Sequence, residues 1–218
     1  MAERPPFHLL LLRHGQTDAN ATGMLQGHLP NPLNALGRQQ AQRLASRVAR
    51  HRPKVTALVS SDLPRATQTA DAVAAACGLA PILDPRWRER GFGALEGHTI
   101  GDREIWRAAH GDTDPPGAES VPAFRARVRE AFEAVARRYA NEPAVAVVTH
   151  GGPVGVVLRL LADGTIPLSA GHDPVEVVQA GNCSVLELVR ESPSGPWRVA
   201  CLNDVTHLAG LATETDSG

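Results

Sequence analysis

Short apolar runs alternate along this chain with longer stretches in which apolar and polar positions are mixed. Three of the runs, residues 7–14, 55–61 and 144–150, are rich in leucine or β-branched side chains and show no polar alternation. Such runs are typical of strands that are buried on both faces of a sheet. Two later runs, residues 184–190 and 197–204, have strand-like composition and extend the predicted sheet.

The mixed stretches show helical periodicity. Residues 34–50 carry a narrow apolar stripe, with Asn34 as the expected N-cap. Residues 63–77 carry a second stripe, with Ser61 and Asp62 as candidate caps. Two further helices are predicted, at residues 120–140 and 153–162.

Strands that alternate with helices predict an α/β domain built on a largely parallel sheet. The chain has 218 residues, of which 43% are hydrophobic, enough for one substantial core. We therefore predict a single domain over residues 1–210. Residues 98–118 mix a short helical pattern with prolines and glycines, which predicts a lid or specificity segment. The polar residues 211–218 are predicted to be a disordered tail.

The composition favours no nucleic acid or membrane as a partner. The 22 lysines and arginines are matched by 23 acidic residues, so a preference for a charged ligand must be local. The arginine-rich residues 38–52 lack the interleaved aromatic side chains that stack on bases. No run approaches the roughly 18 apolar residues of a membrane span, and the first apolar run is too short for a signal peptide. Three widely separated cysteines fit a reducing compartment, so a cytoplasmic protein is expected: Cys77, Cys183 and Cys201.

Arginine and histidine side chains follow the ends of three predicted strands. The first ends in Arg13 and His14, the second leads to Arg65, and the third ends in His150 before Gly151. Ligands of an open α/β sheet bind beyond the carboxyl ends of its parallel strands, so these side chains are expected to converge. Arginine forks and the free N–H groups of helix N-termini bind dianionic phosphate or carboxylate. The sequence therefore predicts an anion pocket.

A histidine in such a pocket can act as a nucleophile. Neutral imidazole attacks well near pH 7, and neighbouring arginines offset the negative charge of a phosphate group. Hydrolysis of a phosphate monoester also needs an acid that protonates the leaving oxygen, because no single group supplies the required acceleration. Residues 86–97 offer two candidates for this acid, Glu89 and Glu96.

Six motifs occur in an order that resembles the histidine phosphatase superfamily, also called phosphoglycerate mutase-like: "LRHGQTDAN", "LQGHLPNPLNALGRQQA", "SSDLPRATQTA", "RERGFGALEG", "GAES" and "VVTHGG". The resemblance implies a three-layer α/β/α sandwich with a mostly parallel central sheet. It gives His14 the role of the nucleophile that becomes phosphohistidine, and Glu89 that of the leaving-group acid. It also implies that no metal and no other cofactor is needed. The residues expected to bind the phosphate or the rest of the substrate are Arg13, Arg65, His150, Asn20, Gln26, Gly27 and Gly151.

The mutases of this superfamily carry a longer, more basic insertion than this chain does. Here Arg103 and Arg107 are the only basic side chains between the glycine-broken loop after Glu89 and Ser120. A shortened segment is less able to keep water from a phosphoenzyme, which favours net hydrolysis. We predict a metal-independent phosphatase of small phosphomonoesters, such as sugar phosphates or phosphoglycerate-type metabolites. Two alternatives remain: a cofactor-dependent phosphoglycerate mutase and a catalytically silent phosphate-binding protein.

Other features of the site are less determined by the sequence. Hydrolysis needs His14 neutral and Glu89 protonated at once, so we predict a pH optimum on the mildly acidic side of neutral. Substrate specificity is assigned to residues 98–118 and to the loop 22–31, which brings Met24, Leu25, His28 and Trp106 as candidate side chains. A homodimer is compatible with the sequence. The remaining histidines show no ligand spacing and no metal site is expected among them: His8, His28, His51, His98, His110, His172 and His207.

Overall fold

The computed structural model describes residues 5–111, 113–169 and 177–211 of the chain. These residues form six strands: β1 (Phe7–Arg13), β2 (Ala57–Ser60), β3 (Pro81–Leu83), β4 (Ala144–Thr149), β5 (Val185–Arg190) and β6 (Arg198–Asp204). The strands make one sheet in the order β3-β2-β4-β1-β5-β6. β1, β2, β3 and β4 are parallel, whereas β5 is antiparallel to both of its neighbours. The predicted α/β class with a mostly parallel sheet is confirmed.

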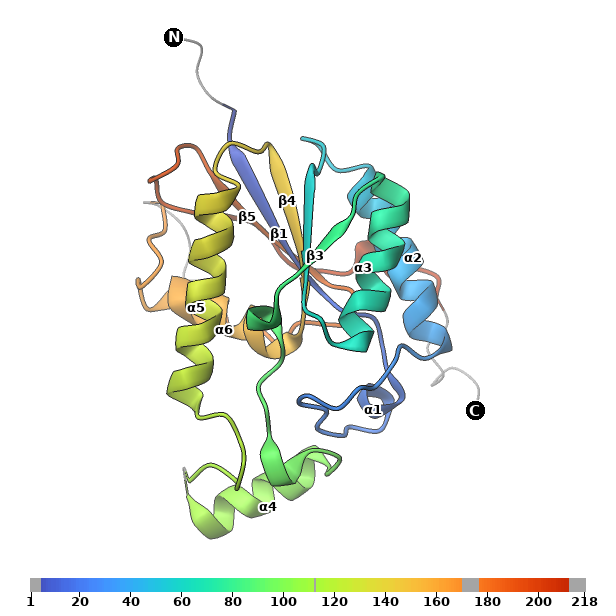
Figure 1. The fold of residues 1–218 in the computed structure, drawn as a ribbon, viewed down its shortest axis with the longest axis vertical. Coiled ribbons are helices and arrows are strands. Elements are labelled where there is room, and N and C mark those ends of the chain that lie inside the picture. The colour runs from blue at the N-terminus through green and yellow to red at the C-terminus, as the bar shows by residue number, and fades with distance from the viewer. Residues whose placement is uncertain (1–4, 112, 170–176, 212–218) are drawn as a thin grey trace.

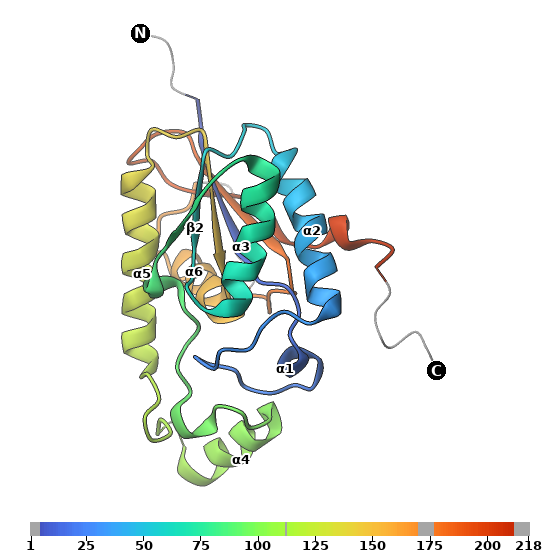
Figure 2. The ribbon, with the colours of Figure 1, turned by 45° about the vertical axis from the view of Figure 1, so that its right-hand side comes forward.

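Helices cover both faces of the sheet and give three layers (Figure 1). One face carries α2 (Ala35–Ala49) and α3 (Pro64–Cys77), and the other carries α5 (Val121–Arg138) and α6 (Gly151–Ala162). Figure 2 shows the two helix pairs on either side of the strands. The short helix α1 (Asp18–Ala21) and the outlying α4 (Ile100–His110) lie beyond the lower edge of the sheet in Figure 1. This is the edge at which β1 ends.

The central strand β1 separates two apolar cores. Leu9 and Leu11 belong to the core under α5 and α6, and Leu10 and Leu12 belong to the core under α2 and α3. All four side chains have no exposed surface. Burial on both faces explains why the run shows no polar alternation, and it makes β1 a rigid support for whatever follows it.

One of three predicted helix starts agrees with the structure, and the other two differ from it. Asn34 caps α2 as expected, accepting a hydrogen bond from the backbone N–H of Gly37 at 2.8 Å. The caps proposed for α3 were wrong, because its N-cap is Leu63 and Pro64 supplies the first turn. α6 starts at Gly151, two residues before the expected position.

The segment 98–118 contains the expected short helix, α4, which begins with a capping box between Thr99 and Asp102. No residue of α4 is buried. The predicted tail lies outside the described residues from 212 onward. Within the described part of the chain, no helix combines the length and apolarity needed to cross a membrane.

Candidate active site

A cavity of about 540 Å³ opens at the edge of the sheet where β1 ends. All but one of the residues that the sequence assigned to the site line this cavity: Arg13, His14, Asn20, Gln26, Gly27, Arg65, Glu89 and Gly151. The remaining one, His150, is fully buried behind the wall. Residues from five separate parts of the chain therefore converge as expected from the ends of parallel strands.

His14 is held in one tautomer by its two ring contacts. Its Nδ1 lies 2.7 Å from the carbonyl oxygen of Gly15, which can only accept, so Nδ1 carries the hydrogen. Nε2 then carries the lone pair of the ring, which accepts a hydrogen bond from Nε of Arg65 at 3.3 Å. Burial, and then Arg65 and Arg13, hold the pKa of His14 well below its ordinary value. The imidazole is therefore neutral at pH 7, with Nε2 as its nucleophilic atom.

The turn after His14 requires a glycine. A Cβ at Gly15 would stand 2.4 Å from the carbonyl oxygen of Gly37, in the first turn of α2. This close approach lets Gly15 donate its N–H to Oγ1 of Thr69 on α3, at 3.1 Å. Two helices on one face of the sheet thus fix the backbone that carries the imidazole.

Arg65 is a buried cation with only 1% of its surface exposed. As the second residue of α3, it donates through Nη1 to the carbonyl of Leu29 at 3.0 Å and through Nη2 to that of Gly27 at 2.8 Å. Burial lowers its pKa to about 10, which leaves the guanidinium charged at neutral pH. The side chain therefore both orients His14 and fixes the loop that follows Gln26.

Arg13 has a donor that nothing among the described residues satisfies. Its Nη1 donates to the carbonyl of Ala180, but its buried Nε has no hydrogen-bond partner there. This Nε lies 3.6 Å from the position of a Cβ on Gly151, at the start of α6. Burial leaves the charge of Arg13 poorly solvated and so lowers its pKa from the usual value. The Arg13 side chain lines the cavity, so its guanidinium can pair with an anionic ligand there.

His150 lies beside His14 and presents a second free atom. The ring centroids of His14 and His150 are 5.0 Å apart, and Nε2 of His150 lies 2.8 Å from Oγ of Ser61. Its buried Nδ1 has no partner among the described residues. Burial, and then Arg65, hold its pKa well below the ordinary value. Ser61, which the sequence suggested only as a helix cap, instead orients this imidazole.

The geometry places Glu89, and not Glu96, on the cavity wall. Oε2 of Glu89 accepts from the N–H of Gly152 at 2.9 Å, so the carboxylate rests on the N-terminus of α6. A Cβ at Gly152 would stand 1.8 Å from Oε1 of Glu89, so this contact requires glycine. Glu96 accepts from the backbone N–H groups of His28 and Phe92, both at 3.0 Å, and so holds a turn together.

Asn20 and Gln26 use their amide oxygens within the protein. Oδ1 of Asn20 accepts from the N–H of Thr17 and from Nδ2 of Asn182, both at 3.2 Å. Oε1 of Gln26 accepts from Oγ1 of Thr17 at 2.9 Å. Neither amide nitrogen donates to another described residue, so both are donors that a ligand in the cavity can use.

Two side chains that support the site were missed in the sequence. Asn182 donates to the carbonyl of His14 at 3.1 Å, and Arg127 on α5 donates to the carbonyl of Glu89 at 3.2 Å. Arg127 is itself held by Glu119 at 2.6 Å. Their partners lie far away in sequence, and no local motif marks either residue.

The outer wall of the cavity agrees in part with the predicted specificity residues. Met24, Leu25 and Arg103 line it, but Trp106 lines a neighbouring cavity of about 270 Å³. His28 instead donates through Nε2 to the carbonyl of Glu89 at 2.9 Å. Beyond the expected segments, the wall also contains Ile100, Phe92, Gly155, Arg159, Val177, Val178 and Gln179.

The cavity offers cations and hydrogen-bond donors, and among the described residues that line it only Glu89 carries a carboxylate. Among the described residues, one group of three side chains could hold a metal ion, and it lies away from the cavity. The arrangement suits an anionic ligand beside a neutral imidazole.

The family profile of the histidine phosphatase superfamily (branch 1) matches residues 9–205. The chain belongs to this superfamily.

Relatives of the chain within the superfamily have different names. "Phosphoglycerate mutase-like protein 4" of Arabidopsis thaliana is 35% identical over 92% of this chain and 86% of its own length. A "probable phosphoglycerate mutase" of Proteus mirabilis is 33% identical over 95% of this chain and 98% of its own.

Two similar solved structures are named for two different activities, a phosphatase and a mutase. A mycobacterial glucosyl-3-phosphoglycerate phosphatase has 28% identity and a TM-score of 0.72, over 91% of this chain and 99% of its own. A phosphoglycerate mutase from Bacillus anthracis has a TM-score of 0.78 over 95% of this chain and 97% of its own, but 22% identity, so it supports the fold alone. The superfamily includes both activities, and the site must decide between them.

Proposed function

We propose that this protein is a metal-independent phosphatase that hydrolyses small phosphomonoesters through phosphohistidine at His14. The observation that carries the proposal is the unprotonated Nε2 of His14, whose lone pair is held only by a 3.3 Å hydrogen bond from Arg65, in a cavity lined by the half-buried Arg13 and the buried Arg65. A phosphate dianion placed there would pair with the guanidinium groups of Arg13 and Arg65, which line the cavity, whereas His150 lies behind its wall.

The reaction has two steps. Nε2 of His14 attacks phosphorus, the bond from phosphorus to the ester oxygen breaks, and Glu89 gives its proton to that oxygen. Water then attacks the phosphohistidine, Glu89 takes a proton from the water, and inorganic phosphate leaves the neutral imidazole. Arg13 and Arg65 remain charged throughout and stabilise the developing negative charge on the phosphoryl oxygens.

Hydrolysis is favoured over phosphate transfer between two positions of one substrate. A mutase must keep water from its phosphoenzyme while the substrate turns. Here the outer wall of the cavity includes Arg103 and Ile100 on α4, a helix that buries no residue. A wall of this kind gives water access to the phosphohistidine.

We further propose that the substrate carries a second anionic group. Arg159 lines the cavity on α6, and its Nη1 lies 3.3 Å from the position of a Cβ on Gly155, one turn nearer the start of the helix. No hydrogen bond or ion pair joins the side chain of Arg159 to another described residue. A carboxylate, as in phosphoglycerate esters, would pair with it while the phosphate lies against His14.

The first experiment measures phosphate release and enzyme labelling in a chelating buffer. Wild-type protein should hydrolyse an aryl phosphate and carry an acid-labile, base-stable phosphate label, and His14→Ala should lose both. His110→Ala, an exposed histidine of α4, is the matched control and should keep both. Label that persists in His14→Ala would refute the assignment. Conversion of 3-phosphoglycerate to 2-phosphoglycerate faster than phosphate release would establish the mutase alternative. Phosphate binding without any turnover would establish a catalytically silent phosphate-binding protein.

The second experiment compares substrates with and without a carboxylate. Arg159→Ala should raise KM for a carboxylated phosphomonoester about tenfold, which corresponds to one charge-assisted hydrogen bond at a partly exposed site. KM for an uncharged aryl phosphate should change less than about twofold. Equal changes for both substrates would remove the second anionic group from the proposal and leave the phosphatase assignment intact.

A further inference from the structure

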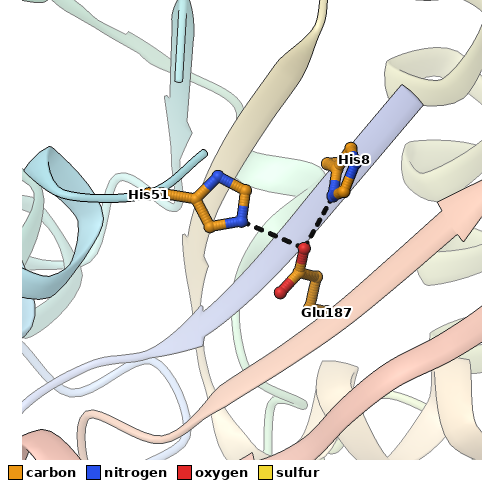
Figure 3. A group of neighbouring side chains, drawn as sticks. All are labelled: His8, His51 and Glu187. Carbon is orange, nitrogen blue, oxygen red and sulfur yellow. Dashed lines mark hydrogen bonds and ion pairs between the residues drawn. The ribbon is translucent and has the colours of Figure 1, made fainter. Parts of the chain in front are cut away.

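A second histidine cluster lies at the amino end of β1, away from the cavity (Figure 3). His8 is on β1, Glu187 is on β5, and His51 follows the end of α2. Nδ1 of His8 and Nε2 of His51 lie 2.7 and 3.0 Å from the same atom, Oε1 of Glu187. A strand rises about 3.3 Å per residue, so His8 is roughly 20 Å from His14. The cluster therefore plays no direct part in the chemistry at the cavity.

Strand register brings two of these side chains to one face of the sheet. His8 is opposite Val189 and Glu187 is opposite Leu10, so both point toward the face that α2 covers. The side chains of His8, His51 and Glu187 are 17, 7 and 13% exposed. A carboxylate at this depth needs partners to offset its lost hydration, and the remaining exposure leaves a path for a small cation.

The contacts of His51 show which of its nitrogens can bind a cation. Nδ1 lies 2.7 Å from the carbonyl oxygen of Pro53, which can only accept, so Nδ1 carries a hydrogen. In the neutral ring, Nε2 then presents a lone pair to the lone pairs of Oε1 of Glu187. Two acceptors 3.0 Å apart require a positive centre between them, either a proton or a metal ion. A ring N–H held by a backbone carbonyl is also the usual outer contact of a metal-binding histidine.

The spacing of the three atoms fits a transition metal. Zinc binds imidazole nitrogen and carboxylate oxygen at about 2.0–2.2 Å, so two ligands of a tetrahedral site lie about 3.3 Å apart. The nitrogen-to-oxygen distances of 2.7 and 3.0 Å would need to open only slightly, and all three donor atoms already lie within 4.8 Å of one another. Two imidazoles and one carboxylate form a ligand set that suits zinc and excludes magnesium or calcium.

We propose that Nδ1 of His8, Nε2 of His51 and the carboxylate of Glu187 form a binding site for a divalent transition metal such as Zn²⁺, with water completing the coordination. The site joins β1, β5 and the segment after α2, which are far apart in sequence. Bound metal would hold these three elements together, so its effect would be on stability and not on turnover. The proposal differs from the expectation from sequence that His8 and His51 have no metal-binding role.

The test uses the full chain, free of any affinity tag and stripped with a chelator. Calorimetric titration with Zn²⁺ should give one site with a dissociation constant of about 10 µM or tighter. Co²⁺ should give the visible absorption of a tetrahedral or five-coordinate ion. His51→Ala and Glu187→Gln should each weaken Zn²⁺ binding about 100-fold or more, because each removes one of three protein ligands. His110→Ala, an exposed histidine on α4, and His14→Ala should retain it.

Each possible result of the Zn²⁺ titrations has a different meaning for the proposed metal site. No binding by the wild-type protein would overturn the proposal without any variant. Undiminished binding by both His51→Ala and Glu187→Gln would overturn it by placing the metal elsewhere, and loss only in His14→Ala would place it in the cavity. Hydrolysis that continues unchanged in chelator is expected, so the test is independent of the proposed phosphatase activity.

Discussion

The two ends of β1 each hold a pair of histidines, but the charges around the two pairs are opposite. At the carboxyl end, His14 and His150 face arginines, and burial followed by Arg65 holds both pKa values well below the ordinary value. At the amino end, the hydrogen bond to Glu187 raises the pKa of His51, and the pKa of Glu187 is itself lowered to about 2. The same side chain is kept neutral at one end and favoured as a cation at the other.

The difference lies in how completely the polar groups are satisfied. At the carboxyl end, Nε of Arg13 and Nδ1 of His150 are buried and have no hydrogen-bond partner among the described residues. At the amino end, Glu187 supplies an acceptor to both His8 and His51. Nε of Arg190 at the amino end also lacks a partner among the described residues, but its guanidinium lies over the rings of Phe7 and Trp197. At the carboxyl end Arg13 lines an open cavity, so the cavity marks that end as the one that binds a ligand.

Among the changes that leave His14 in place, the largest expected effect comes from removing the arginine that organises the catalytic end. Arg65→Ala should lower kcat/KM for an aryl phosphate about 10³-fold or more, because it removes a charge from the phosphate and the donor that orients His14. The carbonyls of Gly27 and Leu29 would also lose their donors. Steady-state kinetics on folded protein measures this, with the exposed Arg125→Ala as control. A loss smaller than about tenfold would contradict the role given to Arg65.

A smaller effect is expected from a single methyl group. Gly152→Ala places a Cβ where Oε1 of Glu89 now stands and should lower kcat for an alkyl phosphate about 10²-fold by displacing the acid. An aryl phosphate, whose leaving group needs less protonation, should lose less. Gly101→Ala is the matched control, because Gly101 is also the second residue of a helix and its nearest atom is Oγ1 of Thr99 at 3.4 Å. Equal losses for both esters would argue against Glu89 as the acid.

The amino end should affect stability alone. In chelating buffer, His51→Ala should lower the free energy of unfolding by about 2 kcal/mol, because the carbonyl of Pro53 and the carboxylate of Glu187 each lose a partner. Turnover per folded molecule should stay within about twofold of wild type. Urea unfolding and kinetics at low temperature measure the two quantities. A large loss of turnover with unchanged stability would reverse the contrast between the two ends.

A further expected effect is a change of stability with pH. His14 and His150 have lower pKa values in the folded protein than in the unfolded one, so below about pH 6.5 the unfolded chain binds more protons. The free energy of unfolding should therefore fall as the pH falls, by at most about 1.4 kcal/mol per pH unit for each histidine. His14→Ala removes one such group, so it should gain stability relative to wild type between about pH 6.5 and about pH 5. A pH-independent difference in urea unfolding would contradict this.

Much of the catalytic end could be predicted because its residues follow strands that show plainly in the sequence. The apolar runs before His14 and His150 mark parallel strands, and the ends of parallel strands meet at one edge. Position alone did not separate Glu89 from Glu96, since both lie on one glycine-rich loop, and only the family resemblance chose Glu89. The contact of Glu89 with Gly152 on a distant helix separates them.

The amino end could not be predicted for a related reason. Glu187 is 179 positions from His8 and 136 from His51, so no motif contains them. Their meeting depends on the antiparallel register of β5 against β1, which apolar periodicity does not specify. Arg159 was hidden in the same way, because a nearly all-apolar helix predicts burial and gives no sign that one of its residues reaches a cavity.

Helix α4 adds residues to the wall of the cavity and none to the core. It supplies Ile100 and Arg103 to the wall while burying no residue of its own. Substitutions in this helix are therefore nearly free of the constraint that folding places on most of the chain. Natural selection can change the range of esters that enters by altering α4, and the phosphate end, built on β1, need not change with it.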